Sequence, residues 1–142
     1  MSGAVVVGVD GSETARRAAE TARGLADALG ATLHVVTAFD NDRTDVVGSG
    51  SDQIVVSGRT AAENIAREVA LELNSPQLQV AYFAVQGAPA QALITQAEQH
   101  GAQMIVVGNK RMRGLGRVLG SVANTVAHNA PCDVYIAKTD EP

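Results

Sequence analysis

Residues 4–30, "AVVVGVDGSETARRAAETARGLADALG", indicate the class of fold most clearly. The stretch opens with an apolar, β-branched run at 4–10 that has the length of a strand. A helical pattern follows and ends at Gly30, a usual helix stop. This pattern is one apolar stripe at helical spacing, made by Ala15, Ala18, Ala19, Ala22, Leu25, Ala26 and Leu29. The stretch therefore predicts a buried strand followed at once by an amphipathic helix.

The alternation of strand and helix patterns continues along the chain. Strand-length apolar runs follow at 32–39, 78–85, 102–108 and 132–138. Helical patterns begin at Thr60 and Pro89, and a last one covers 119–129. The alternation predicts an α/β fold, a three-layer sandwich in which a five-stranded parallel sheet carries helices on both faces. A crevice is then expected at the carboxyl ends of the strands, where the strand order reverses.

Length and composition restrict the class of protein. A chain of 142 residues that is 46% hydrophobic and 18% charged fits a single domain over 1–142 and is too apolar for intrinsic disorder. Cys132 is the only cysteine, so no internal disulfide can form. His34, His100 and His128 lie on different predicted elements without the spacing of metal ligands, and we interpret them as structural or surface histidines.

The net charge and the amino-terminal residues indicate which partners and which cellular location to expect. The net charge is −4, although Lys110, Arg111, Arg113 and Arg117 lie close together. The rest of the chain holds seven basic against fifteen acidic residues, a balance of −8, so no nucleic-acid partner is expected. The first apolar run follows no basic leader and is too short for a membrane-spanning core. We therefore expect a cytoplasmic protein with no membrane partner.

One connection is too long for a compact α/β unit. Residues 40–57, "DNDRTDVVGSGSDQIVVS", are rich in Asp, Gly and Ser and separate a strand from a helix. We expect a flexible loop there. It is either a disordered connection or a lid over the crevice.

A second long stretch, "VVGNKRMRGLGRVLGSVANTV" at 106–126, combines four glycines with four basic residues. A phosphate site needs backbone N–H groups that converge at a helix N-terminus, with glycines where the chain turns sharply. The segment is not a Walker A loop, and its glycine spacing does not match a dinucleotide fingerprint. The residues alone leave two interpretations open, a phosphate site that the basic side chains serve or a solvated basic turn.

Four segments together resemble the single-domain universal stress proteins over nearly the whole chain. They are "VVVGVDGSETARRA" at 5–18, "VQGAPAQALI" at 85–94, "MIVVGNK" at 104–110 and "RVLGSVANTVAHNAPCDVYIAK" at 117–138. The resemblance implies an adenine-nucleotide alpha-hydrolase-like sheet of order 3-2-1-4-5. It also implies ATP or a related adenine nucleotide as the ligand of some members, and homodimers that pair through the last strand, here 132–138.

The family's nucleotide-binding pattern is glycine, two residues, glycine, nine residues, glycine, then Ser or Thr. Gly108 matches the first glycine, but Arg111 stands at the second, and only eight residues separate it from Gly120 and Ser121. Arg111 either closes the phosphate site or serves it with its guanidinium. The binding residues that the resemblance implies are Val9, Asp10, Gly11, Ser12, Ala38, Gly108, Asn109, Lys110, Arg111, Arg113, Gly120, Ser121, Val122 and Ala123.

The resemblance also gives roles to residues near the first two strands. Asp10 would accept a hydrogen bond from a ribose hydroxyl or hold a nucleotide-bound Mg²⁺, and its alternative role is helix capping with Glu13. Ala38 would contact the adenine above a floor at Val9, and its alternative role is core packing.

The resemblance and these residues together predict a homodimeric stress-response or regulatory module that binds ATP, AMP or cyclic AMP between the first and fourth strands. One alternative is a ligand-free dimeric interaction protein of the same fold, which Arg111 favours. Another is a slow ATPase, although the predicted crevice offers no general base besides Asp10, so no catalytic residue is assigned. The strand at 132–138 is expected at a sheet edge, where its unpaired backbone can pair with a second copy.

Overall fold

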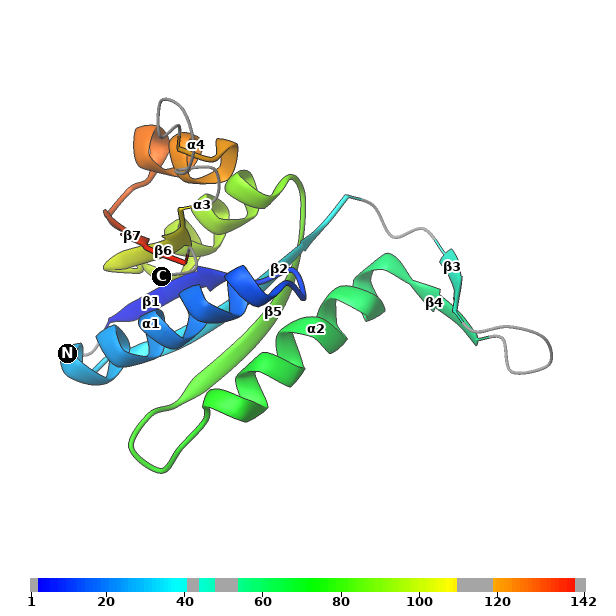
Figure 1. Ribbon diagram of the computed structural model, residues 1–142, viewed down its shortest axis with the longest axis horizontal. Coiled ribbons are helices and arrows are strands. Elements are labelled where there is room, and N and C mark those ends of the chain that lie inside the picture. The colour runs from blue at the N-terminus through cyan, green and yellow to red at the C-terminus, as the bar shows by residue number, and fades with distance from the viewer. Residues whose placement is uncertain (1–2, 41–43, 48–53, 110–118, 140–142) are drawn as a thin grey trace.

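The computed structural model describes residues 3–40, 44–47, 54–109 and 119–139 (Figure 1). Five parallel strands form the central sheet, in the order β5-β2-β1-β6-β7. They are β1 (Ala4–Gly8), β2 (Thr32–Phe39), β5 (Val80–Gln86), β6 (Met104–Gly108) and β7 (Asp133–Ala137). Counted along the chain, this is the order 3-2-1-4-5, so the expected topology is confirmed. The order reverses between β1 and β6, and the crevice is expected there.

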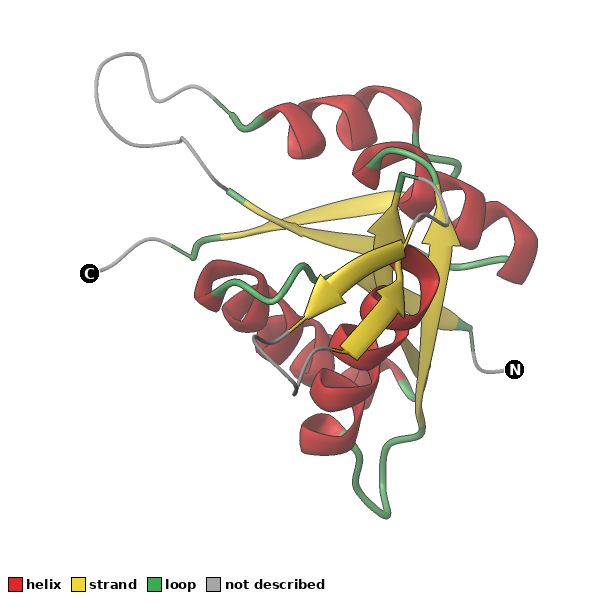
Figure 2. Ribbon diagram, turned by 90° about the vertical axis from the view of Figure 1, so that its right-hand side faces the viewer, coloured by secondary structure: helices red, strands yellow, loops and turns green. Residues whose placement is uncertain are grey.

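Two helices cover each face of the sheet (Figure 2). Helices α1 (Glu13–Leu29) and α2 (Gly58–Leu73) pack on one face, and α3 (Pro89–His100) and α4 (Ser121–Asn129) pack on the other. Because helices cover both faces of the sheet, the three-layer sandwich is confirmed. Helix α2 begins two residues before the predicted Thr60. No helix within the four described ranges is both long and apolar enough to cross a membrane.

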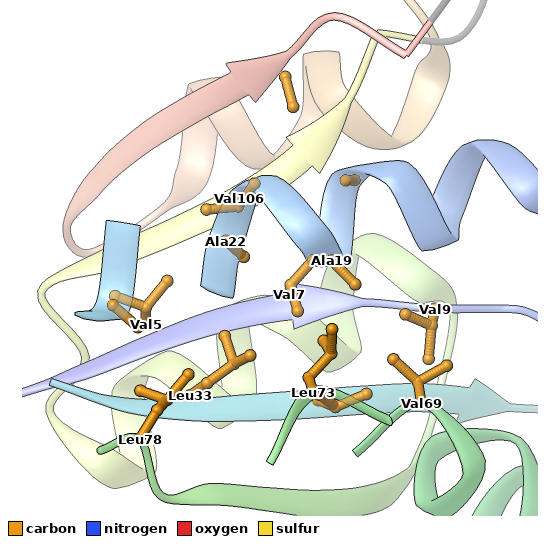
Figure 3. Packing of buried hydrophobic residues seen from close by; sticks show 14 of the residues in the cluster. Val5, Val7, Val9, Ala19, Ala22, Leu33, Val69, Leu73, Leu78 and Val106 are labelled. Atoms are coloured by element: carbon orange, nitrogen blue, oxygen red, sulfur yellow. The ribbon is translucent and has the colours of Figure 1, made fainter. Parts of the chain in front are cut away.

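Alternate residues of β1 point to opposite faces of the sheet. Val5 and Val7 belong to the cluster beneath α1 and α2, whereas Val6 belongs to the cluster beneath α3 and α4. Figure 3 shows Val5 and Val7 on the side of the sheet that faces Ala19 and Ala22 of α1. Both alanines are fully buried, and their small side chains let the helix lie close to the strands. Burial on both faces explains why the sequence of β1 is an unbroken apolar run.

The turn between β1 and α1 excludes one of the two roles considered for Asp10, the capping of α1. The N-cap of α1 is Ser12 rather than Asp10, and the Ser12 Oγ accepts a hydrogen bond from the Ala15 amide at 3.2 Å. The Asp10 Oδ1 accepts from the Ser12 amide at 3.0 Å and so closes the turn that precedes the helix. Gly11 has φ = 87°, a left-handed conformation that favours glycine. Asp10 therefore shapes the turn without capping the helix.

The segment at 40–57 contains secondary structure that the sequence analysis missed. Strands β3 (Thr44–Val47) and β4 (Ile54–Ser57) pair in an antiparallel hairpin. Figure 1 shows this hairpin projecting beyond the amino end of α2, away from α4. Residues 41–43 and 48–53 lie outside the described ranges. The loop is thus partly replaced by paired strands, and its flexibility stays a prediction.

Candidate functional site

A cavity of about 340 Å³ lies at the carboxyl ends of β1 and β6, where the strand order reverses. Many of the predicted binding residues line it, namely Val9, Asp10, Ala38, Gly108, Gly120, Ser121, Val122 and Ala123. The lining also includes residues that the sequence analysis did not select, namely Gly8, Thr14, Ala15, Ala18, Val36, Pro89, Leu93, Val107 and Thr139. The cavity thus joins segments far apart in the sequence at the switch point of the sheet.

The end of β1 forms the floor of the cavity. Gly8 lies close to α3, since a Cβ there would approach the Leu93 Cδ2 at 3.1 Å, tighter than an ordinary contact. The Val9 amide donates to the Val36 carbonyl at 2.8 Å, so the sheet continues one residue past β1. Asp10 follows at once, and it is the only ionisable residue among the described residues of the lining. The described part of the lining therefore carries one exposed carboxylate, at the end of β1.

The first turn of α4 forms another part of the lining. Gly120 is the N-cap of this nine-residue helix and makes no side-chain cap. Ser121, Val122 and Ala123 follow, and all line the cavity. The first N–H groups of a helix have no partner within the helix and carry the positive end of its dipole. This wall can therefore bind an anionic group.

Aliphatic residues form the walls between these polar ends. Val36 and Ala38 come from β2, Leu93 comes from α3, and Val107 comes from β6. Val36, Leu93 and Val107 also belong to the buried cluster beneath α3 and α4. Such a surface can bury the faces of a flat ring, while the few polar groups fix its orientation.

Asn109 lies just past β6, and its side chain contacts a residue of the cavity lining. Its Oδ1 accepts hydrogen bonds from the Thr139 amide at 2.7 Å and from the Thr139 hydroxyl at 3.0 Å. The Arg17 Nη1 donates to the Thr139 carbonyl at 3.1 Å. Thr139 lines the cavity, whereas Asn109 is not among the lining residues. No motif marks Thr139 in the sequence, because its position depends on contacts with distant residues.

The remaining predicted residues divide into two groups. Gly11 and Ser12 form the turn and the cap before α1, and neither is among the lining residues. Lys110, Arg111 and Arg113 lie outside the described residues. Whether Arg111 closes the phosphate site or serves it therefore stays a prediction.

Two of the histidines are neighbours, which the sequence analysis did not anticipate. His34 on β2 is buried, and its Nδ1 lies 3.3 Å from the Gln96 Nε2. Its ring centroid is 5.0 Å from that of Phe83 and 5.0 Å from that of His100. Burial, followed by the charge of His100, lowers the pKa of His34 below its ordinary 6.5. Neither histidine lines the cavity, and the described residues hold no cluster of three metal-ligating side chains.

Comparison with known proteins agrees with this geometry. The model of the universal stress protein family matches residues 1–138. A universal stress protein of Thermus aquaticus is 31% identical over 94% of this chain and 97% of its own length. One of Mycobacterium tuberculosis is 31% identical over 95% of each chain. A solved structure of a universal stress protein in complex with cAMP is 31% identical and has a TM-score of 0.72, and the match covers 98% of each chain. The chain therefore belongs to the universal stress protein family.

Proposed function

We propose that this chain binds an adenine nucleotide, namely ATP, AMP or cyclic AMP, in the cavity between β1 and β6. One observation carries the proposal: a single cavity brings together the carboxylate of Asp10, the strand-end Gly108 and the amino end of α4. These are an anionic acceptor, a close backbone approach and an anion-binding helix terminus, around aliphatic walls. The cAMP complex of a relative that is 31% identical supports the choice of ligand.

Each part of the cavity has a role in this proposal. The aliphatic residues Val36, Ala38 and Leu93 would hold the adenine ring. Asp10 would accept a hydrogen bond from a ribose hydroxyl. The N–H groups that begin α4 would face the phosphate, where a negative charge complements the helix dipole. We propose that Lys110, Arg111 and Arg113 contribute charge beside the same phosphate.

Mg²⁺ fits this site only as a partner of the nucleotide. Asp10 is the only carboxylate among the described lining residues, and Mg²⁺ commonly combines one or two carboxylates with phosphate oxygens and water. The ion would neutralise charge between Asp10 and a polyphosphate. A ligand with a single phosphate has less need of it.

Isothermal titration of ATP, AMP and cyclic AMP, with and without Mg²⁺, tests this function. Saturable binding of one of them supports it, and no binding of any at millimolar concentration contradicts it. Asp10→Asn keeps an oxygen that can accept from the Ser12 amide but removes the negative charge. It should weaken binding, whereas Asp27→Asn, at the far end of α1, should not.

Thermal unfolding separates nucleotide binding from the ligand-free alternative. A ligand at 100 times its Kd adds about 2.7 kcal/mol to the free energy of unfolding. Mg-ATP or cyclic AMP should therefore raise the unfolding midpoint. If neither nucleotide changes it, a dimeric interaction protein of the same fold becomes the better account.

We further propose that the protein is a homodimer paired through β7, acting as a stress-response or regulatory module in the cytoplasm. β7 lies at an edge of the sheet. Tyr135 is 43% exposed and Ile136 is 38% exposed, and they point to opposite faces of the strand. An edge with large side chains exposed on both faces suits pairing with a second copy.

Analytical ultracentrifugation at micromolar concentration tests the dimer. The unaltered chain should sediment as a dimer, and Ile136→Lys should shift it toward the monomer. Tyr82→Lys is the matched control, because Tyr82 is 44% exposed on β5 at the opposite edge. A monomeric unaltered chain, or equal effects of the two substitutions, would contradict pairing through β7.

A further inference from the structure

We propose that Arg17 and Asn109 are positioning residues that hold Thr139 in place as a wall of the cavity. These three residues are called the Thr139 clamp below. The proposal deepens the nucleotide-binding function proposed above and rests on it. In this proposal, Asn109 supports a neighbouring residue through its Oδ1.

The clamp engages every polar group of Thr139. The amide and the hydroxyl of Thr139 donate to the Asn109 Oδ1 at 2.7 and 3.0 Å, and the Thr139 carbonyl accepts from the Arg17 Nη1 at 3.1 Å. Thr139 is 2% exposed and Asn109 is 4% exposed. Buried hydrogen bonds of this kind are costly to break, because a group left without its partner is not rehydrated. The position of Thr139 is therefore well defined.

The clamp joins three elements that surround the cavity. Asn109 directly follows β6, Thr139 lies two residues past β7, and Arg17 belongs to α1. Arg17 lies on α1 between Thr14 and Ala18, both of which line the cavity. A displacement of Thr139 would thus change the wall at the point where three elements meet.

Thr139 packs closely on the strand-end glycine. A Cβ at Gly108 would meet the Thr139 Cγ2 at 3.4 Å and the Thr139 Oγ1 at 3.5 Å. Gly108 and Thr139 both line the cavity, and Gly108 begins the glycine-rich segment. The clamp therefore holds the side chain of Thr139 beside Gly108 in this wall.

A second arginine of α1 provides a matched control. The Arg23 Nε donates to the Leu73 carbonyl at 3.0 Å, which joins α1 to the end of α2. Leu73 is not among the lining residues. Arg17 and Arg23 thus make the same kind of hydrogen bond from the same helix, but only Arg17 acts on a residue of the cavity. Comparing them separates a positioning role from a purely structural one.

The test compares Arg17→Met, Thr139→Val and Arg23→Met with the unaltered chain, by isothermal titration of cyclic AMP at a temperature where circular dichroism shows every variant folded. Arg17→Met and Thr139→Val should raise the Kd roughly fivefold to tenfold, the effect of one hydrogen bond. Arg23→Met should leave it within about twofold, although both arginine variants lower the unfolding midpoint. Thr139→Ser keeps the hydroxyl and should restore most of the affinity. Equal Kd values for the two arginine variants would overturn the proposal.

Hydrogen exchange without nucleotide tests the clamp separately from the function. Arg17→Met should speed amide exchange in residues 104–109 and 119–123, whereas Arg23→Met should not. If the unaltered chain binds none of the three nucleotides, the proposed function fails. The exchange pattern then tests by itself whether Arg17 holds Thr139 in place. Unchanged exchange in both segments would overturn the proposal.

Discussion

The rings of His34 on β2 and His100 on α3 lie 5.0 Å apart between centroids, at an interplanar angle of 80°. His34 is buried and also contacts Gln96, so a positive charge on its ring would be poorly solvated and would face a second histidine. The pKa of His34 is accordingly lowered, first by burial and then by His100. This pair is a source of pH sensitivity that lies outside the cavity.

Stability should fall as the pH falls below about 6.5. In that range the unfolded chain binds a proton at His34, whereas the folded chain does so only at a lower pH. The contribution of His34 is therefore fully present above pH 6.5 and is lost as the pH falls through the lowered pKa. Urea unfolding at pH 8, 7, 6 and 5.5 measures this. His34→Gln should flatten the dependence of stability on pH, whereas His128→Gln, at an exposed position of α4, should not. A profile that His34→Gln leaves unchanged would contradict the assignment.

Thr37→Val should stabilise the protein. The Thr37 Oγ1 is buried and has no hydrogen-bond partner among the described residues, and such a group costs about 1–3 kcal/mol. Valine keeps the shape of threonine without the hydroxyl, so the free energy of unfolding in urea should rise by about 1 kcal/mol. Thr95→Val is the control, because the Thr95 Oγ1 accepts from the Gln91 Nε2 at 3.3 Å. A loss of stability in Thr37→Val would show that this hydroxyl is satisfied in solution.

Two glycine-to-alanine substitutions should have opposite signs. Gly24 lies within α1, and a Cβ there meets nothing within 4 Å, so Gly24→Ala should stabilise by about 0.5–1 kcal/mol. At Gly8 the new Cβ would lie 3.1 Å from the Leu93 Cδ2, so Gly8→Ala should destabilise by about 1–3 kcal/mol. Thermal and urea unfolding of both variants check the pair. A stabilising Gly8→Ala would show that Leu93 moves aside freely.

Ala38→Leu should weaken nucleotide binding by about tenfold or more while the protein stays folded. Ala38 lines the cavity and is only partly buried, so a larger side chain would occupy space proposed for the adenine ring. Titration of cyclic AMP gives the affinity, and circular dichroism confirms the fold. Unchanged affinity would remove Ala38 from the proposed site.

Local patterns were sufficient to predict the strands and helices of the sandwich. The apolar run of β1 follows from burial of the strand on both faces, and the alanine stripe of α1 follows from burial of the helix on one face. The strand order came from the family resemblance instead, because periodicity does not say which strands are neighbours. The hairpin of β3 and β4 was missed because the segment around it is rich in glycine, serine and aspartate.

The family resemblance, together with local features such as strand and helix ends, predicted about half of the residues that line the cavity. Asp10 and Gly120 adjoin the ends of a strand and a helix, and both line the cavity. The family resemblance implied Asn109 as a ligand contact, which stays a prediction, and it did not reveal the contact with Thr139, thirty positions further along. Thr139 itself follows the last strand in a segment without a pattern. Such roles arise from tertiary contacts, which a single sequence does not reveal.

Crystals of the protein grown with cyclic AMP test the proposed nucleotide site. We expect nucleotide density in the cavity between β1 and β6, with the ring against Val36 and Ala38, the ribose beside Asp10 and the phosphate at the amino end of α4. An empty cavity at saturating cyclic AMP, or a nucleotide bound elsewhere on the chain, would contradict it.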